Sequence, residues 1–192
     1  MWRKPSEAAK PSLAGQAVYG KQVPLNRAVA LWGGVSPGGF AAVVFHKCKK
    51  LTSAEWANAV RLGKLRDAIV SLHPTKPAGP WHVLCDNERF LTSPAATAAH
   101  RKSKVTLWKI PRQSPDLNPV ELFWGWLRRR LRTLDLKDLV AKKPLLGKMA
   151  YKARVARVCQ SQRAQRVAAA CAKNLRTVCL KVIRNNGAAS GH

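Results

Sequence analysis

The sequence predicts an α/β fold, and three observations support this prediction. Short apolar runs bounded by proline or glycine, such as Val83–Cys85 and Val105–Ile110, are typical of buried strands. Longer segments between such runs carry apolar residues at helical spacing. An aspartate directly follows one strand, at the edge where open α/β sheets place their polar functional groups. A chain of 192 residues suffices for one domain with a buried core.

A β-hairpin is expected within residues 16–46. Its strands cover Val29–Trp32 and Phe40–Phe45. The connection, residues 33–39, holds four glycines and one proline, which are the residues that tight turns favour.

A single helix is predicted to follow the hairpin. Thr52 and Glu55 stand at the spacing of a capping box, and apolar residues then recur on one face up to about Leu72. Three prolines and a glycine in residues 73–80 indicate a loop that leads into the next strand.

The second half of the chain is expected to be mainly helical. Ser93 and Pro94 predict the start of a short alanine-rich helix that reaches about His100. Another helix starts after the strand 105–110, and residues 148–184 are expected to be helical and basic. The apolar residues of the middle helix, which recur at a spacing that buries one face, are Val120, Trp124, Leu127, Leu131 and Leu134.

Two acidic residues stand where local structure would aim them at one point. Asp86 falls at the C-terminal end of the strand 83–85. Thirty-four residues separate it from Glu121, the last residue of the run SPDLNPVE. In that run Asn118 suits a helix N-cap, Pro119 the first helical position and Glu121 the first turn. A strand-end aspartate and a helix-start glutamate can share a divalent metal ion.

The metal would be Mg²⁺ or Mn²⁺, because hard ions prefer oxygen ligands and Mg²⁺ usually takes one or two carboxylates. A pair of such ions can activate the nucleophile and stabilise the leaving oxygen when a phosphodiester is cut. Two plainer interpretations remain open. Asp86 can be an ordinary turn residue, and Glu121 can be the capping-box partner of Asn118.

These residues resemble the DDE transposases of the mariner superfamily. The family's catalytic domain carries one Asp, a second Asp followed by a short polar motif, and then S-P-D-L-N-P-x-E before an aromatic and basic helix. Here the match runs through Asp86, Glu121 and Phe123–Leu127, and weaker likenesses occur at Trp2–Lys4, Ala30–Val35 and Val182–Gly187. The residues that support the motif around the two acids are Asn87, Ser114, Pro115, Asp116, Asn118 and Pro119.

The resemblance implies a ribonuclease-H-like (retroviral-integrase-like) mixed sheet flanked by helices. Residues 1–140 would be a partial catalytic domain of this kind, and residues 141–192 a basic helical extension with a frayed end. Asp86 and Glu121 would be the catalytic and metal-binding residues of a two-metal site. The resemblance also implies a homodimer, TA target sites and no small-molecule cofactor.

A third carboxylate is missing from the expected place. The family's first catalytic Asp would lie shortly before the segment matched by Trp2–Lys4, where this sequence begins. Glu88 would share a face with Asp86 if the strand continued, and it is either a metal ligand or a solvated turn residue. The other acids upstream of Asp86, none of which lies in an apolar strand, are Glu7, Glu55 and Asp67. We therefore expect an N-terminally incomplete domain whose second and fourth strands lack their shared neighbour.

The charge of the chain predicts a polyanionic partner. The formal net charge is +26, from 35 basic and 9 acidic residues, which favours DNA or RNA. No acid follows Asp138, whereas twelve lysines or arginines lie from Lys142 to Arg184. Residues expected to contact the DNA backbone, rather than only to solubilise a surface helix, are Arg128, Arg129, Arg130, Arg132, Arg154, Arg157, Arg163 and Arg166.

Composition also bears on location. The sequence has no stretch of eighteen apolar residues, so we expect no membrane span. It also has no apolar segment near the N-terminus of the kind that a secretory signal needs. Five cysteines without a C-x-x-C pair indicate a reduced, intracellular protein. With DNA as partner and a basic run at Lys47–Lys50, we expect a nuclear or nucleoid-associated protein.

Two classes of function remain open. The first is a metal-dependent transposase, or DDE endonuclease domain, that cuts and joins DNA and is expected to be inactive without its third carboxylate. The second is a non-catalytic nucleic-acid-binding protein, either a decayed relic or a domesticated copy. A small basic protein of ribosomal type would leave the run SPDLNPVE unexplained.

Overall fold

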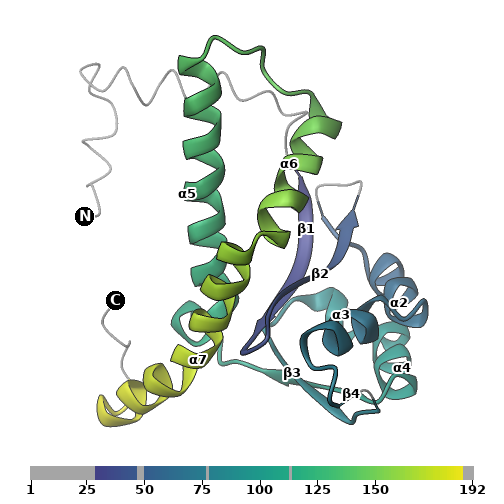
Figure 1. Ribbon diagram of the computed structural model, residues 1–192. Coiled ribbons are helices and arrows are strands. Elements are labelled where there is room, and N and C mark those ends of the chain that lie inside the picture. Colours follow the sequence, from purple (N-terminus) through teal and green to yellow (C-terminus); the bar gives the residue numbers. More distant parts are fainter. Residues whose placement is uncertain (1–28, 47–49, 77, 113, 188–192) are drawn as a thin grey trace, which may run out of the picture.

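The computed structural model describes residues 29–46, 50–76, 78–112 and 114–187 (Figure 1). The predicted segments at Trp2–Lys4 and Lys47–Lys49, and the frayed end after Gly187, lie outside the described residues. The elements in chain order are β1 (Ala30–Ser36), β2 (Gly39–His46), α2 (Ser53–Arg61), α3 (Lys64–Leu72), β3 (Trp81–Cys85), the 3₁₀ turn η4 (Arg89–Thr92), α4 (Pro94–Lys102), β4 (Val105–Lys109), the 3₁₀ turn η5 (Pro115–Leu117), α5 (Pro119–Val140), α6 (Lys148–Gln160) and α7 (Gln162–Arg184).

The predicted hairpin is present, but its strands reach further into the turn. β1 and β2 pair antiparallel along their length, and only Pro37 and Gly38 connect them. The prediction that residues 33–36 belong to the connection is therefore wrong. Gly33 suits this part of the strand because the ring of Phe40 lies against it, where an added Cβ would come within 2.7 Å of a ring carbon.

The helix predicted after the hairpin is in fact two helices. The capping box is confirmed, since Thr52 Oγ1 accepts from the Glu55 N–H at 3.2 Å and Glu55 Oε2 accepts from the Thr52 N–H at 2.9 Å. The prediction of one unbroken helix to Leu72 is wrong. Gly63 separates α2 from α3, and its φ of 80° is a left-handed conformation that glycine adopts at little cost.

Strands β3 and β4 form a parallel pair connected through α4. Ser93 starts α4 as predicted, because its side chain accepts from the Ala96 N–H at 3.2 Å. The register places Cys85 opposite Lys109. Both strands therefore end at the same edge, and Asp86 follows β3 there.

The basic C-terminal segment is helical, as predicted, and it is also divided. Ser161 ends α6 and caps α7 by accepting from the Ala164 N–H at 3.3 Å. Helix α5 leads away from the strands, and α6 returns beside it before α7 continues in the same direction (Figure 1).

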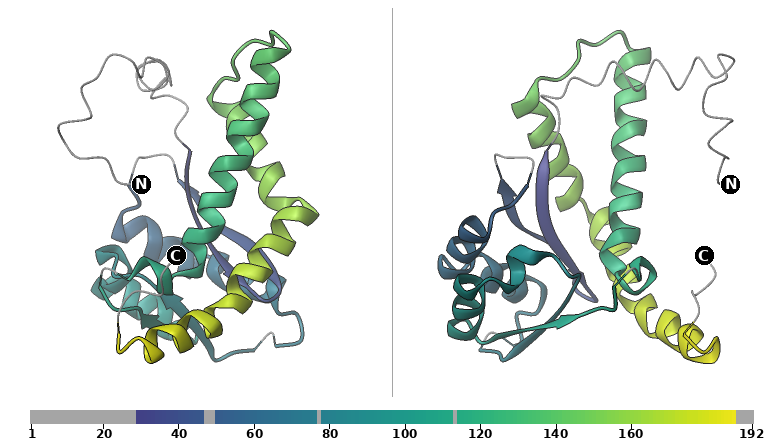
Figure 2. Two further views of the ribbon diagram at one scale, coloured as in Figure 1. Left: turned by 90° about the vertical axis from the view of Figure 1, so that its left-hand side faces the viewer. Right: turned by 180° about the vertical axis from the view of Figure 1, so that it is seen from behind.

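Each face of the hairpin packs against its own core. Figure 2 shows α2, α3 and α4 gathered on one side of the hairpin and α5, α6 and α7 on the other. On the first side the fully buried Trp56 packs with Trp32, and its Nε1 donates to His100 Nε2 at 2.9 Å. Burial lowers the pKa of His100, so this imidazole is neutral at pH 7. On the second side the fully buried Phe123 stacks on Phe40 with ring centroids 4.5 Å apart.

The two sheets are not paired with each other. Within the described residues, β2 is the one strand neighbour of β1, and β4 is the one strand neighbour of β3. The described strands thus form one antiparallel pair and one parallel pair.

The four cysteines in the described segments are free. Burial raises the pKa of Cys159 to about 11, so this thiol stays protonated at neutral pH. No helix of the described segments has the length and apolar character that crossing a membrane requires.

Candidate active site

Asp86 lies where the sequence predicts it, directly after β3. Its side chain is half-buried. Asn87 fixes this position, because its Nδ2 donates to the Ile110 carbonyl oxygen at 2.8 Å, and the Ile110 N–H donates to the Cys85 carbonyl oxygen at 3.0 Å. The end of β3 is thereby tied to the end of β4. Asp86 is held at a rigid strand edge.

Glu121 lies in the first turn of α5, also as predicted. The preceding loop contains the short turn η5, which the Asn118 N–H closes by donating to the Pro115 carbonyl oxygen at 3.1 Å. Pro119 occupies the first helical position. The buried Asn118 side chain makes no capping hydrogen bond, so the alternative that Glu121 serves a capping box with Asn118 is wrong. The Glu121 side chain is exposed.

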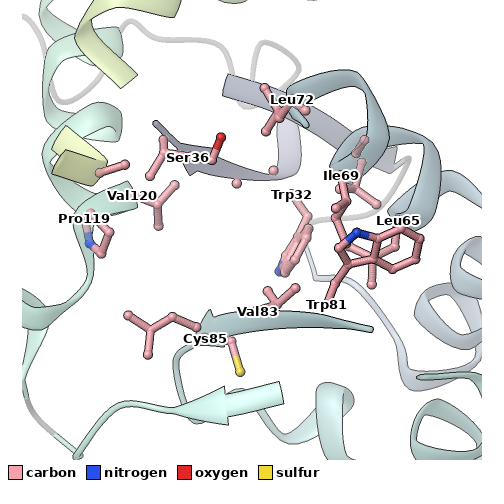
Figure 3. A pocket seen from close by; sticks show the side chains of 18 of the residues that line it. Trp32, Ser36, Leu65, Ile69, Leu72, Trp81, Val83, Cys85, Pro119 and Val120 are labelled. Carbon is pink, nitrogen blue, oxygen red and sulfur yellow. The ribbon is translucent and has the colours of Figure 1, made fainter. Parts of the chain in front are cut away.

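Both acids line one cavity. It measures about 800 Å³ and lies between β1 and β3, and we call it the inter-sheet cavity. Figure 3 shows Pro119 and Val120 on the side of the cavity opposite Leu65 and Trp81, with Cys85 at the end of β3. The structure therefore places on the lining of one cavity two acids that thirty-four residues separate in the sequence.

The electrostatic setting of this acid pair is unusual for so basic a chain. Every ion pair found among the described residues involves Asp135 or Asp138, and none involves Asp86 or Glu121. The Glu88 N–H reaches Asp86 Oδ1 at 3.4 Å, which is long for a hydrogen bond. The start of α5 adds partial positive charge beside Glu121. Two carboxylates that pair with no basic side chain of the described segments, one of them at a helix N-terminus, fit a divalent metal ion together with phosphate oxygens.

The described segments offer few side chains that could bind a metal ion beside Asp86 and Glu121. No group of three or more His, Cys, Asp or Glu side chains in the described segments is placed to hold a metal ion. Glu88 is exposed and also lines the inter-sheet cavity, so its assisting role stays a prediction. The supporting role of Asp116 in the run SPDLNPVE also stays a prediction.

The arginines proposed for DNA contact fall on two surfaces. On α5, Arg128, Arg129 and Arg132 are exposed and Arg130 is half-buried. On α6 and α7 the exposed arginines are Arg157, Arg163 and Arg166. All seven are placed where a phosphate backbone could reach them, and their DNA contact remains a prediction.

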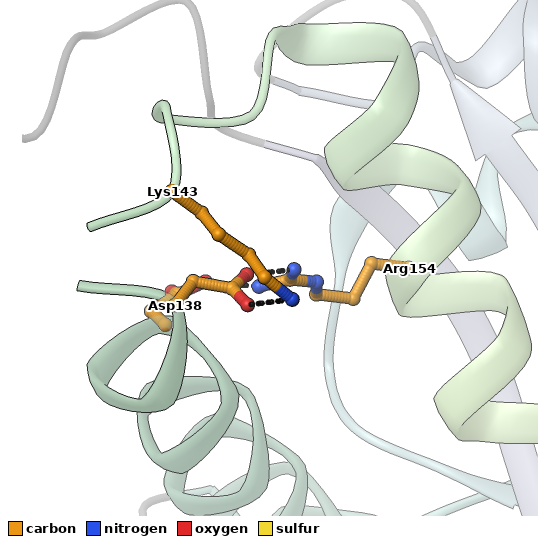
Figure 4. Close-up of polar contacts among 4 residues, drawn as sticks. Asp138, Lys143 and Arg154 are labelled. Carbon is orange, nitrogen blue, oxygen red and sulfur yellow. Dashed lines mark hydrogen bonds and ion pairs between the residues drawn. The ribbon is translucent and has the colours of Figure 1, made fainter. Parts of the chain in front are cut away.

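Arg154 is placed differently from the other predicted arginines. Its Nη1 donates to Asp135 Oδ1 at 2.8 Å and its Nη2 donates to Asp138 Oδ2 (Figure 4). Lys143 Nζ lies 3.8 Å from Asp138 Oδ1. The hydrogen bond from Arg154 holds the pKa of Asp138 below its ordinary value. This guanidinium ties α6 to α5, and the assignment of Arg154 to DNA contact stays a prediction.

Sequence reasoning missed two features of the site. The first is the pairing of Arg154 with Asp135 and Asp138, for which acids three residues apart on α5 gave a weak signal. The second is the wall of the inter-sheet cavity contributed by β1, including Trp32, which no local pattern indicates.

The fold is ribonuclease-H-like. A structure of the Mos1 transposase catalytic domain with raltegravir and Mn matches 90% of this chain and 88% of its own, with a TM-score of 0.56 and 14% identity. A crystal structure of the catalytic domain of Mos1 mariner transposase matches 91% and 89%, with a TM-score of 0.53 and 14% identity. At this identity the likeness shows the fold alone.

The family follows from the sequence. The model of the DDE superfamily endonucleases matches residues 3–140, and the chain belongs to this family. The Tcb1 transposable-element transposase of Caenorhabditis briggsae is 42% identical over 52 residues, which are 27% of this chain and 19% of that relative. The match thus spans less than two thirds of the relative's length. The resemblance to mariner-superfamily DDE transposases is confirmed.

Proposed function

We propose that this DDE endonuclease domain acts on DNA phosphodiesters with Mg²⁺ or Mn²⁺ held by Asp86 and Glu121. One observation carries the proposal: in a chain of net charge +26, two acids that pair with no basic side chain of the described segments line the same cavity. Bound metal would activate the attacking water or 3′-hydroxyl and stabilise the leaving oxygen. The Mos1 structures with Mn and with Mg make the same ions reasonable for this chain.

The chain's own residues would position these groups. Asn87 keeps Asp86 at the strand edge through its bond to Ile110. Pro119 sets the start of α5, and the helix N-terminus attracts the phosphate that is to be cut. The exposed arginines of α5 would hold the flanking backbone without reading its sequence.

We further propose that the 192-residue chain cuts DNA slowly or not at all. Two carboxylates are one fewer than the family's pattern, and the described segments offer no third ligand beside them. This observation favours a second candidate function, a non-catalytic DNA-binding protein that uses only the basic surface.

Nicking of supercoiled plasmid with Mn²⁺ or Mg²⁺, measured beside duplex binding, distinguishes these functions. An endonuclease gives metal-dependent nicking that disappears in Asp86→Ala and Glu121→Ala and persists in the matched variant Asp67→Ala, an exposed acid outside this cavity. Salt-sensitive duplex binding without nicking assigns the non-catalytic function. Nicking that survives Asp86→Ala or Glu121→Ala would remove both residues from the site.

Location and assembly follow from the proposed partner. A protein that works on DNA would reside in the nucleus or the nucleoid. We also propose a homodimer that brings two DNA ends together, which sedimentation of the chain with and without duplex DNA would test.

A further inference from the structure

We infer that Trp108 on β4 is a stacking site for an unpaired base of a DNA strand. Trp108 is not part of the lining of the inter-sheet cavity, so this contact is separate from the acid pair. The inference rests on the proposed action on DNA and adds a contact to a base, whereas the exposed arginines of α5 would contact only the backbone.

Trp108 is exposed where the other tryptophans are covered. Of the six tryptophans in the described segments it alone is exposed, to 57% of its surface. Trp56 and Trp81, by contrast, belong to the buried core. Exposure by itself is ordinary for a single apolar residue, so the surroundings of Trp108 decide what it can bind.

A second ring lies beside Trp108 on the same face of the strand pair. Exposure alternates along both strands, and the residues on the outer face are His82, Leu84, Thr106 and Trp108. The ladder pairs Leu84 with Trp108, and the ring centroids of His82 and Trp108 are 4.7 Å apart. Because both rings stand on strands, they form an aromatic surface that needs little ordering when a flat ligand binds.

The segment that carries Trp108 is basic throughout. Between Glu88 and Asp116 the sequence has no acid and six basic residues, which are Arg89, Arg101, Lys102, Lys104, Lys109 and Arg112. All six are exposed, and no ion pair found among the described residues involves them. Lys104 precedes β4 and Lys109 ends it, so positive charge lies at both ends of the strand that carries the indole. Aromatic rings among unpaired cations are the combination with which proteins hold single-stranded nucleic acid.

Other partners fit this face less well. Its large apolar side chains are Leu84 and Trp108, which are few for a protein interface of about 800 Å² per partner. A second copy of this chain would bring a charge of +26 against the same charge. Bases inside a duplex are stacked on one another, so an indole can stack only on a base that has left the duplex.

Trp108 also lies close to the acid pair. It is opposite Leu84, two residues before Asp86. With about 4.8 Å between strands and about 3.3 Å per residue, the Cα atoms of Trp108 and Asp86 are roughly 8 Å apart. A DNA strand whose phosphate reaches Asp86 would therefore have the base of a neighbouring nucleotide within reach of the indole. Trp108 would act as a positioning residue for that strand.

Binding of single-stranded DNA to the full chain, measured in EDTA so that no cutting occurs, tests the inference. The probe is a fluorescein-labelled oligothymidylate. Its matched control has the same length and the same phosphates, with abasic sites in place of the bases. We expect the chain to bind the oligothymidylate at least about fivefold more tightly than the control, because stacking of a single base contributes this much or more.

Three variants assign this preference to a residue. Trp108→Leu keeps an apolar side chain without a flat face; it should bind the oligothymidylate about fivefold more weakly than the parent and the abasic control within about twofold of it. Trp108→Phe should retain most of the preference. Ile183→Ala, at an apolar side chain exposed on α7, is the matched control and should bind both probes as the parent does. Circular dichroism establishes that each variant is folded.

Three results would overturn the inference. The first is equal affinity of the parent chain for the two probes, and the second is a preference for bases that persists in folded Trp108→Leu. The third is an equal loss of affinity for both probes in Trp108→Leu, which would show a backbone contact or a structural role. Duplex binding measured in the same series separates these results from a failure of the proposed function. A chain that binds the duplex without any preference for bases lacks only the stacking site, whereas a chain that binds no DNA lacks both.

Discussion

Two pairs of acidic residues, one near each end of α5, differ in whether a basic side chain of the described residues forms an ion pair with them. Near the C-terminal end, Asp135 and Asp138 share the guanidinium of Arg154. At the N-terminal end, Glu121 and its cavity neighbour Asp86 take part in no ion pair among the described residues, although four arginines follow on the same helix. The first pair joins two helices, and the second pair keeps its oxygens available. Among the described residues of this strongly basic chain, this contrast supports the proposed metal site at Asp86 and Glu121.

The largest expected difference between the two acid pairs is in metal binding. Asp86→Asn and Glu121→Gln should each weaken Mn²⁺ binding by more than about 100-fold, since even outer-shell partners of a metal site account for about 10–100-fold. Titration followed by electron paramagnetic resonance measures this. Asp67→Asn, at an exposed acid outside the cavity, and Arg154→Gln are the matched controls and should bind Mn²⁺ as the parent does. Equal loss in Arg154→Gln would erase the distinction between the pairs.

For thermal stability we expect the opposite: loss of the cation of Asp135 and Asp138 should lower it, and changes at Asp86 should not. Arg154→Gln leaves two carboxylates on neighbouring turns of α5 without their cation, so the melting temperature should fall by about 5 °C. The exposed Arg157→Gln on the same helix should change it by no more than about 1 °C. Without metal, Asp86→Asn should not lower it at all. A melting temperature of Arg154→Gln equal to that of Arg157→Gln would show that the bridge contributes nothing.

A smaller difference between Arg154 and the arginines exposed on α7 is expected in the salt dependence of DNA binding. Arg163→Gln and Arg166→Gln should each reduce the slope of log affinity against log salt for duplex DNA by about 0.9, because each removes one phosphate contact. Arg154→Gln should leave the slope unchanged. Fluorescence anisotropy at several salt concentrations measures all three. A lower slope in Arg154→Gln would place this residue in the DNA-contacting set.

The smallest effect is the pH dependence of the bridge. The pKa of Asp138 is lowered in the folded protein, so the bridge contributes its full stability above the unfolded pKa, about 3.9. That contribution is lost as the pH falls through the lowered folded value. Urea unfolding should therefore give a constant difference between the parent and Arg154→Gln from pH 7 to about pH 4, and a shrinking one below. A difference that shrinks already between pH 7 and pH 5 would contradict the assignment to Asp138.

The sequence predicted those parts of the molecule that local chemistry determines. Some features depend only on residues within a few positions of one another. They are the strand-end position of Asp86, the first-turn position of Glu121 and the helix caps at Thr52 and Ser93. Their placement is confirmed. Gly63 shows the limit of such signals, because a glycine in a helical pattern is tolerated in some helices and ends others.

The parts that sequence reasoning missed depend on contacts between distant residues. Arg154 follows a helical spacing that suits a phosphate-binding face, yet Asp138, sixteen positions earlier, lies within reach once α6 folds back along α5. Trp32 became part of the cavity wall only through the placement of β1 opposite β3. Neither outcome can be read from periodicity, because each depends on how whole elements pack.

The contact between Gln165 and the hairpin also controls the direction in which the sheet can grow. Gln165 Oε1 occupies the outward N–H of Phe40, and its Nε2 is anchored to the Cys159 carbonyl oxygen at 2.9 Å. Gly39 makes room for it, since a Cβ there would come within 2.2 Å of the same oxygen. Near the turn, the outer edge of β2 therefore has its Phe40 N–H already bonded within the protein, which removes one donor that an added strand would need.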